Sequence, residues 1–229
     1  MESASGSLEK KHKIKIVDNF HNNYLENILE LHNKNRIKDK NNNICYSVGL
    51  IRIQKIVNCY DVIKKLSCSL DFFKKNDCSI NIVFYHGRLP IALRSYIEAK
   101  LDKALYRKGA NDPFLKSDLY KDGLNKNKEG TKNIITIVVA SPVIEVGRDF
   151  DFDWAIVEPT SSRAVIQTMG RVNRHRDLKI KNENILIMNK NYNLIQNRKK
   201  GYDNVETQKD IKVVFKILCQ HRVIPKIVS

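Results

Sequence analysis

The chain has 229 residues, 42% of them hydrophobic, which is enough for one α/β domain with a real core plus extensions. No apolar run approaches the roughly 18 to 20 residues that a membrane helix needs, and the opening MESASGSLEKKHK lacks the apolar segment of a signal peptide. We therefore expect no membrane partner and a cytoplasmic location. The net charge of +16 favours phosphate-backbone binding, although a Lys- and Asn-rich composition can also reflect coding bias.

The cysteines are odd in number and none stands in a C-x-x-C pair: Cys45, Cys59, Cys68, Cys78 and Cys219. Without a secretory signal, we interpret them as reduced structural thiols. The six histidines are dispersed, so we expect no metal site.

Strand and helix patterns alternate through the first two thirds of the chain. In order, we expect a helix over 19–35, a polar linker over 33–43, a strand over 46–54, a helix over 57–74, a strand over 80–86 and a helix over 90–106. Residues 107–133 place glycines and a proline among lysines and asparagines, which predicts a long polar insertion, either a solvated excursion or a functional loop.

The next segments predict strands of a buried parallel sheet. Residues 134–140, IITIVVA, form an unbroken apolar run, and a second run covers 154–157. A helix over 161–176, a strand over 184–188 and a C-terminal helix over 206–220 follow. The alternation predicts an α/β fold, with a mostly parallel sheet sandwiched by helices.

A polar loop follows the first of these strands, where ligands collect in open α/β sheets. It contains Ser141, Glu145, Gly147 and Asp149. Asp149 could accept hydrogen bonds from a ribose, and Ser141 could meet a nucleic-acid phosphate. The alternative is an acidic surface loop, because aspartates alternate at 149, 151 and 153.

The segment SSRAVIQTMGRVNRHR predicts an anion-binding helix. Gln167, Arg171 and Arg174 would fall within about 60° of one another on a helix. The opposite side, facing the core, would carry Val165, Ile166, Met169 and Val172. Gly170 would cost about 1 kcal/mol in mid-helix, which favours close approach of a ligand to the backbone. The alternative is a surface helix with two exposed arginines.

These two segments resemble motifs V and VI of superfamily-2 helicases. Together with FYHGRLPIALRSYIEAKLD and YSVGLIRIQKI, the wording SPVIEVGRDFDFDWAIVEP is similar to the helicase–nuclease of type I-F CRISPR systems, over roughly residues 28 to 190. The resemblance implies the second RecA-like lobe of that enzyme, an ATP-dependent DNA helicase of antiviral defence.

The resemblance also implies roles for individual residues. Arg174 would be the arginine finger, assisted by Arg171. The ATP-binding positions would be Gln167, Gly170, Gly147 and Asp149, and the DNA-binding positions Ser141, Glu145, His86 and Arg88. Ser141 stands where the family commonly has threonine, and Pro142 where glutamine is common. His86 could equally be a structural histidine at a strand end.

A phosphate-cradling G-x-x-x-x-G-K-[ST] loop does not occur in this sequence, nor does a cluster of His and Asp for a two-metal nuclease. We therefore expect half an ATP site, in a truncated or fragment form, that binds ATP and Mg²⁺ only when paired with a Walker-motif lobe. The implied partners are single-stranded DNA, the missing first lobe and nuclease domain, and the CRISPR surveillance complex.

We expect an N-terminal extension and linker over 1–45, the RecA-like lobe over 46–190 and a basic helical extension over 191–229. Two other functions stay open. One is a non-catalytic module that binds DNA or the surveillance complex, and the other is a different superfamily-2 translocase.

Overall fold

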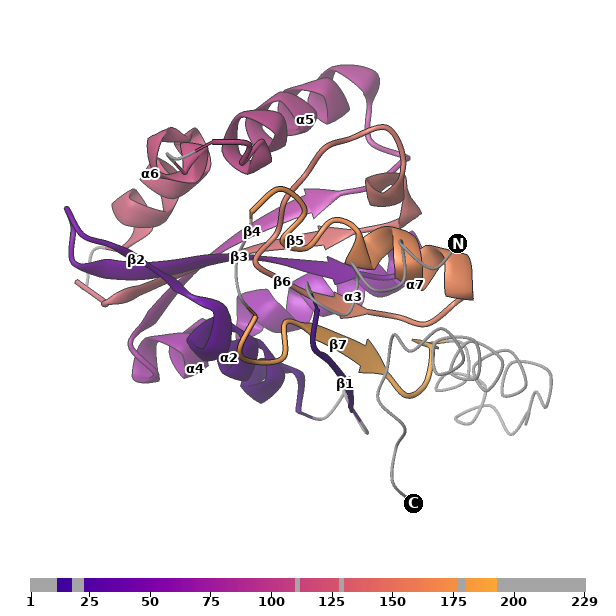
Figure 1. Ribbon diagram of the computed structural model, residues 1–229, viewed down its shortest axis with the longest axis horizontal. Coiled ribbons are helices and arrows are strands. Elements are labelled where there is room, and N and C mark those ends of the chain that lie inside the picture. Colours follow the sequence, from indigo (N-terminus) through magenta and orange to yellow (C-terminus); the bar gives the residue numbers. More distant parts are fainter. Residues whose placement is uncertain (1–11, 18–22, 110–111, 128–129, 177–179, 193–229) are drawn as a thin grey trace.

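A computed structural model describes residues 12–17, 23–109, 112–127, 130–176 and 180–192. Its sheet has seven strands in the order β1-β7-β6-β3-β5-β4, with β2 beside β3 (Figure 1). The strands are β1 (Ile14–Val17), β2 (Ile37–Asp39), β3 (Ile44–Arg52), β4 (Cys78–Tyr85), β5 (Asn133–Ala140), β6 (Trp154–Val157) and β7 (Ile185–Met188). Every described pairing is parallel except that of β2 with β3. The predicted α/β fold with a mostly parallel sheet is confirmed.

Helices cover both faces of the sheet (Figure 1). The α-helices are α2 (Tyr24–Asn35), α3 (Ile56–Cys68), α4 (Leu70–Lys75), α5 (Ile91–Leu105), α6 (Asp118–Lys126) and α7 (Ser162–Met169), and the 3-10 helices are η1 (Pro113–Lys116) and η2 (Pro142–Glu145). One core lies between the sheet and α2, α3 and α4, and the other between the sheet and α5, η1, α6 and α7. Alternate residues of β5 enter opposite cores, with Val138 in one and Val139 in the other. A strand buried on both faces explains its unbroken apolar sequence.

The N-terminal region contributes to the sheet itself. β1 pairs with β7, and β2 pairs with β3. The tract 33–43, expected as a linker, contains the end of α2, all of β2 and a turn in which Asp39 accepts a hydrogen bond from the Asn41 amide. A three-residue strand leaves no periodic signal in the sequence, because its stability comes from pairing with β3.

The polar insertion is also part of the core. Residues 107–133 fold into η1 and α6, and bury Phe114, Leu119 and Tyr120 against the sheet. The expectation of a solvated excursion is therefore wrong. Apolar residues spaced among lysines concealed a short amphipathic helix whose apolar side faces β4 and β5.

Smaller differences concern the remaining elements. The helix expected over 57–74 is divided at Ser69 into α3 and α4, which leaves Leu70 exposed. The C-terminal helix over 206–220 and almost all of the extension over 191–229 lie outside the described residues. Within the described residues, no helix is both long enough and apolar enough to cross a membrane.

Candidate functional site at the carboxyl edge of the sheet

The carboxyl ends of the central strands meet at one edge. Arg52 at the end of β3 lies opposite both Ala140 of β5 and Val157 of β6, and Ala140 also lies opposite Tyr85 of β4. The loops that leave these ends carry nearly all the predicted site residues, as expected for an open α/β sheet. His86 and Ser141 are neighbours there, because the Ser141 amide donates to the Tyr85 carbonyl at 3.1 Å.

Glu145 links three of these segments. Its carboxylate accepts a hydrogen bond from Nε of the buried Arg52 at 2.7 Å, and its carbonyl accepts one from Arg171 Nη2 at 3.0 Å. Burial lowers the pKa of Arg171, and the nearby Arg174 adds to this effect. The carboxylate of Glu145 is thus engaged within the protein, at a position for which the family resemblance implied a DNA contact.

The predicted arginine helix is shorter than expected. α7 ends at Met169, and Gly170 caps it with φ −63°, donating its amide to the Ile166 carbonyl at 3.0 Å. A Cβ at Gly170 would meet only ordinary contacts at 3.5 Å. Because α7 ends at Met169, Gly170 does not stand in mid-helix, and that part of the prediction is wrong. Arg171 and Arg174 lie in the turns that follow, and the shared helical face with Gln167 is wrong as well.

The buried side of this segment was mostly predicted correctly. Val165, Met169 and Val172 are fully buried, whereas Ile166 is exposed. Val172 follows the helix and forms a parallel bridge with Phe152, which secures the turn to the polar loop after β5. Gln167 is half-buried on α7.

The structure brings Asp149 and Arg174 into contact. Arg174 Nε lies 2.5 Å from the Asp149 carboxylate, which also contacts Lys108 Nζ at 2.6 Å and His175 Nε2 at 2.9 Å. The hydrogen bond from Lys108 is the largest cause that lowers the pKa of Asp149 to about 2. Asp149 and Arg174, which were predicted to contact ATP from two separate segments, are therefore paired with each other.

The next two aspartates are buried, so the interpretation of an acidic surface loop is wrong. Asp151 and Asp153 form ion pairs with Arg176 at 2.8 and 2.5 Å, and Asp153 also pairs with the buried Arg107 at 2.8 Å. These two carboxylates and two guanidinium groups, named here the buried ion cluster, connect the insertion to both motif loops. Arg107 and Arg176 were not among the predicted site residues, because no local sequence pattern marks an arginine that pairs with an aspartate inside the protein.

Asp151 also holds the backbone of the turn that carries Arg174. Its carboxylate accepts the amide of Arg174 at 3.0 Å and that of His175 at 3.2 Å. Asn173 adopts φ 45° immediately before this point. A buried carboxylate that accepts two amides fixes the direction in which the Arg174 side chain leaves the backbone.

Gly147 and Arg148 anchor the polar loop. Gly147 has φ +70°, a conformation that favours glycine over any other residue. Arg148 then turns toward α5, where it pairs with Glu98 and, at 3.0 Å, with Asp102. The loop is thereby fixed in place on both sides of Gly147.

His86 and Arg88 follow β4 at the same edge. His86 is buried, its ring centroid lies 4.2 Å from that of Phe84, and burial lowers its pKa. Arg88 is exposed. Arg88 can reach a solvent-borne phosphate, whereas His86 resembles the structural histidine that the sequence left open.

The described residues contain neither an activated buried thiol nor a group of side chains suited to a metal ion. Burial raises the pKa of the Cys59 and Cys78 thiols to about 12, which keeps them protonated. Within the described ranges, no three His, Cys, Asp or Glu side chains are grouped so that they could hold a metal ion. Cys219 lies outside these ranges.

Comparisons with known proteins place the chain in a family. Residues 45–177 match the family model described as CRISPR-associated nuclease/helicase Cas3, C-terminal. The chain is 33% identical over 178 residues to the subtype I-F/YPEST Cas3 of Pectobacterium atrosepticum, and 34% identical over 158 residues to that of Pseudomonas aeruginosa. These alignments cover 76% and 68% of this chain, but only 16% and 14% of the two relatives.

Solved structures share the fold. T. fusca Cas3 with AMPPNP matches with a TM-score of 0.54 at 16% identity, over 95% of this chain and 25% of that one. A chain from a CRISPR RNA-guided surveillance complex, pre-nicking, matches with a TM-score of 0.51 at 14% identity, over 95% of this chain and 26% of the other. At these identities, the matches establish the fold alone.

Proposed function

The chain belongs to the family of C-terminal domains of the CRISPR-associated nuclease/helicase Cas3, and from this premise we propose that it is the second RecA-like lobe of an ATP-dependent DNA helicase in type I CRISPR interference, acting in the cytoplasm. The observation that carries the proposal is the grouping of Asp149, Arg171 and Arg174 at the carboxyl edge of the sheet. The chain spans about one sixth of its curated relatives, so the complete activity belongs to a larger assembly.

In that assembly, ATP with Mg²⁺ would lie between this edge and a Walker-motif lobe, and would supply the phosphoryl group whose transfer drives motion along DNA. Arg174 and Arg171 would meet the γ-phosphate and stabilise the charge that develops in the transition state. Gln167, Gly170 and Gly147, on the neighbouring segments, would border this position.

The ion pair between Arg174 and Asp149 is the arrangement we expect while the Walker-motif lobe and ATP are not bound. A guanidinium that is to bind a phosphate must first release Asp149, which would then be available to a ribose hydroxyl. Lys108 remains beside Asp149, so the charge of Asp149 stays compensated when Arg174 leaves.

Single-stranded DNA would cross the neighbouring part of the same edge. Arg88 is exposed there, and the buried Ser141 is the N-cap residue of η2, directly beside the end of β4. In this proposal Arg88 contacts a phosphate, while Glu145 and His86 shape the loop that carries Ser141.

The test mixes the purified chain with a separately encoded Walker-motif lobe and measures ATP hydrolysis with and without single-stranded DNA. We expect DNA-stimulated turnover in the mixture, which Arg174→Ala lowers by about a thousandfold or more, the usual effect of losing an arginine finger. Arg163→Ala, an exposed arginine on α7, is the matched control and should retain turnover.

DNA binding separates the motor from the alternative. Arg174→Ala should leave DNA affinity nearly unchanged, and equal loss of hydrolysis and DNA binding would contradict its role as the finger. If the mixture never hydrolyses ATP but the chain binds DNA or the surveillance complex, the chain is a non-catalytic binding module.

A further inference from the structure

β4 is an edge strand of unusual character. It pairs with β5 on one side and stands at the end of the described sheet. Its sequence, CSINIVFY, contains no charged residue and no proline. Proteins generally protect a long edge strand with charges, prolines, bulges or a covering segment, because its backbone groups can pair with any other strand. The sequence of β4 lacks these protections and is therefore typical of a strand that pairs on both sides.

The backbone groups that face outward can be identified. The Ser141 amide donates to the Tyr85 carbonyl, and the Asn133 side chain donates to the Asp77 carbonyl, so odd-numbered residues turn toward β5. Alternation then turns the backbone groups of Ile80, Ile82 and Phe84 toward the free edge. Outside the ladder with β5, the hydrogen bonds of the described residues include none to the backbone of these three.

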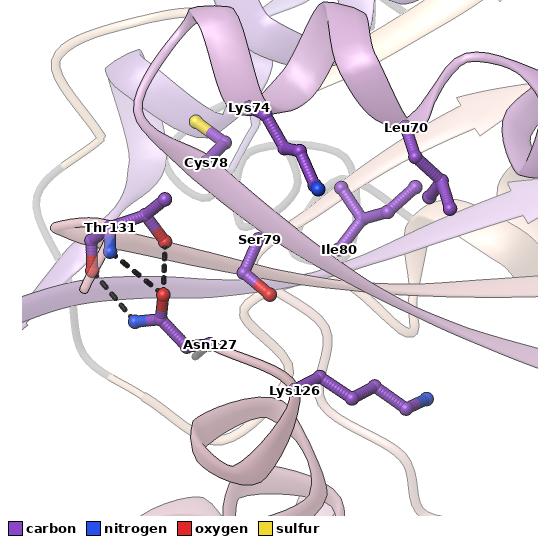
Figure 2. A pocket seen from close by; sticks show the side chains of 8 residues that line it. All are labelled: Leu70, Lys74, Cys78, Ser79, Ile80, Lys126, Asn127 and Thr131. Carbon is purple, nitrogen blue, oxygen red and sulfur yellow. Dashed lines mark hydrogen bonds between the residues drawn. The ribbon is translucent and has the colours of Figure 1, made fainter. Parts of the chain in front are cut away.

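A pocket of about 330 Å³ surrounds the first half of this edge. It is lined by Leu70, Lys74, Cys78, Ser79, Ile80, Lys126, Asn127 and Thr131. Figure 2 shows Leu70 and Lys74 descending from α4 toward Ile80, with Ser79 on the opposite side of the strand, where Lys126 lies. Because successive side chains of a strand point to opposite faces, the pocket spans both faces of the edge.

The charges around the pocket select its occupant. Lys74 stands on one side of the strand and Lys126 on the other, where its ammonium donates to Asn81 Oδ1 at 2.9 Å. A second copy of the chain would bring the same two lysines and a net charge of +16, and residues 190–229 of this chain are also strongly basic. Both would be repelled, whereas carboxylates would be attracted.

We propose that the β4 edge binds an extended acidic segment of another protein as an added strand. The backbone of that segment pairs with Ile80, Ile82 and Phe84. Its neighbouring side chains alternate between the two faces, so that adjacent carboxylates meet Lys74 and Lys126. Main-chain pairing supplies affinity and the two lysines supply specificity, as in other cases of strand addition.

The test uses a short blocked peptide of valine and threonine with two adjacent central glutamates. Its affinity for the full chain is measured by fluorescence anisotropy, and the binding position by hydrogen exchange of individual amides. We expect binding that protects the amides of Ile80, Ile82 and Phe84. The same peptide N-methylated on alternate nitrogens, or with lysines in place of the glutamates, should bind at least about tenfold more weakly.

Paired variants test the lysines. Lys74→Glu with Lys126→Glu should reverse the preference toward the lysine peptide, while Lys103→Glu with Lys116→Glu, two exposed lysines at a separate cleft, should leave it unchanged. No binding of the acidic peptide, or equal binding of the N-methylated peptide, would overturn the proposal. Protection of the same amides by self-association would assign the edge to a second copy instead. Neither measurement involves ATP, so the outcome is independent of the motor function.

Discussion

At the scale of single residues, the buried ion cluster decides the geometry of the candidate site. Asp151 is fully buried and accepts hydrogen bonds from the Arg174 and His175 amides as well as from the guanidinium of Arg176. Desolvation makes such groups costly, and only mutual pairing keeps them charged in the interior. The turn that carries Arg174 is therefore held by a fully buried carboxylate, whose partner Arg176 is only partly exposed to solvent.

Asp151→Asn should destabilise the fold strongly. The substitution keeps the shape of the side chain but removes a charge opposite Arg176, and breaking a buried pair costs about 3 kcal/mol or more. Urea denaturation measures the loss in free energy of unfolding. Asp61→Asn, an exposed aspartate on α3, is the control and should change the stability little. Equal stabilities of the two variants would contradict the cluster's structural role.

His32 on α2 is buried on the face of the sheet covered by α2, α3 and α4, and its protonation should make stability depend on pH. Its Nδ1 lies 2.8 Å from Ser47 Oγ and its Nε2 lies 3.2 Å from Asn133 Oδ1. Ser47 Oγ in turn accepts the indole N–H of Trp154 at 3.0 Å. Burial is the largest cause that lowers the pKa of His32 from 6.5 to about 4. The neutral imidazole is thus the form that the folded chain accommodates.

Acid should therefore weaken the fold through His32. Between pH 6.5 and about 4 the unfolded chain binds more protons than the folded one, so stability falls as the pH falls through this window. The shift corresponds to about 3 kcal/mol at most. Urea denaturation at several pH values should give a steeper slope for the unmodified chain than for His32→Gln. Identical slopes would show that another group governs this range.

At the scale of elements, β3 and β6 pack closely because a glycine of β3 leaves room for the tryptophan ring of β6. Gly49 pairs in register with Trp154, and a Cβ at residue 49 would lie 2.1 Å from the indole Cζ2. Glycine is required here because the ring lies over its backbone. This contact sets the position of β6, and with it the start of the loop that leads to α7.

Gly49→Ala should lower the free energy of unfolding by about 1–3 kcal/mol, because overpacking forces the indole or the strand to shift. Thermal and urea denaturation both measure the effect. Gly87→Ala is the matched control, since a Cβ there would meet no atom within 4 Å. If the two alanine variants were equally stable, the close packing of Gly49 on Trp154 would be refuted.

At the scale of the whole molecule, the charge is distributed unevenly. Residues 134–189 are neutral, with seven basic and seven acidic residues, although the chain as a whole carries +16. The motif loops use their arginines in internal ion pairs, as in the contacts of Arg174 and Arg176. The excess positive charge therefore lies in the other segments of the sequence.

Single-stranded DNA should consequently bind with strong salt dependence and little sequence preference. With about five phosphate contacts, affinity should fall roughly 100-fold between about 50 and 200 mM salt. Fluorescence anisotropy with oligonucleotides of different sequence measures both properties. Arg88→Ala should reduce the slope by about 0.7, and Arg163→Ala should not. Binding that is indifferent to salt would contradict the electrostatic interface.

Much of this protein follows from sequence alone. The runs at 134–140 and 154–157 predicted β5 and β6 almost to the residue, because strands buried on both faces must be apolar throughout. The resemblance of the motif segments to those of the type I CRISPR helicase–nuclease indicated the family, which the comparisons confirm. An apolar run and a short motif each lie within a few consecutive residues, so the sequence displays them directly.

The tertiary structure alone decided where the charges go. Arg107 meets Asp153 across 46 positions of sequence, and Arg52 meets Glu145 across 93. Distant partners such as Arg107 turn the acidic loop, which the sequence left open as a surface loop, into the buried ion cluster. The early end of α7 is also a tertiary feature, because the chain then forms a bridge from Val172 to Phe152. A carboxylate has the same sequence letter whether it meets water or an arginine, and the fold determines which of the two it meets.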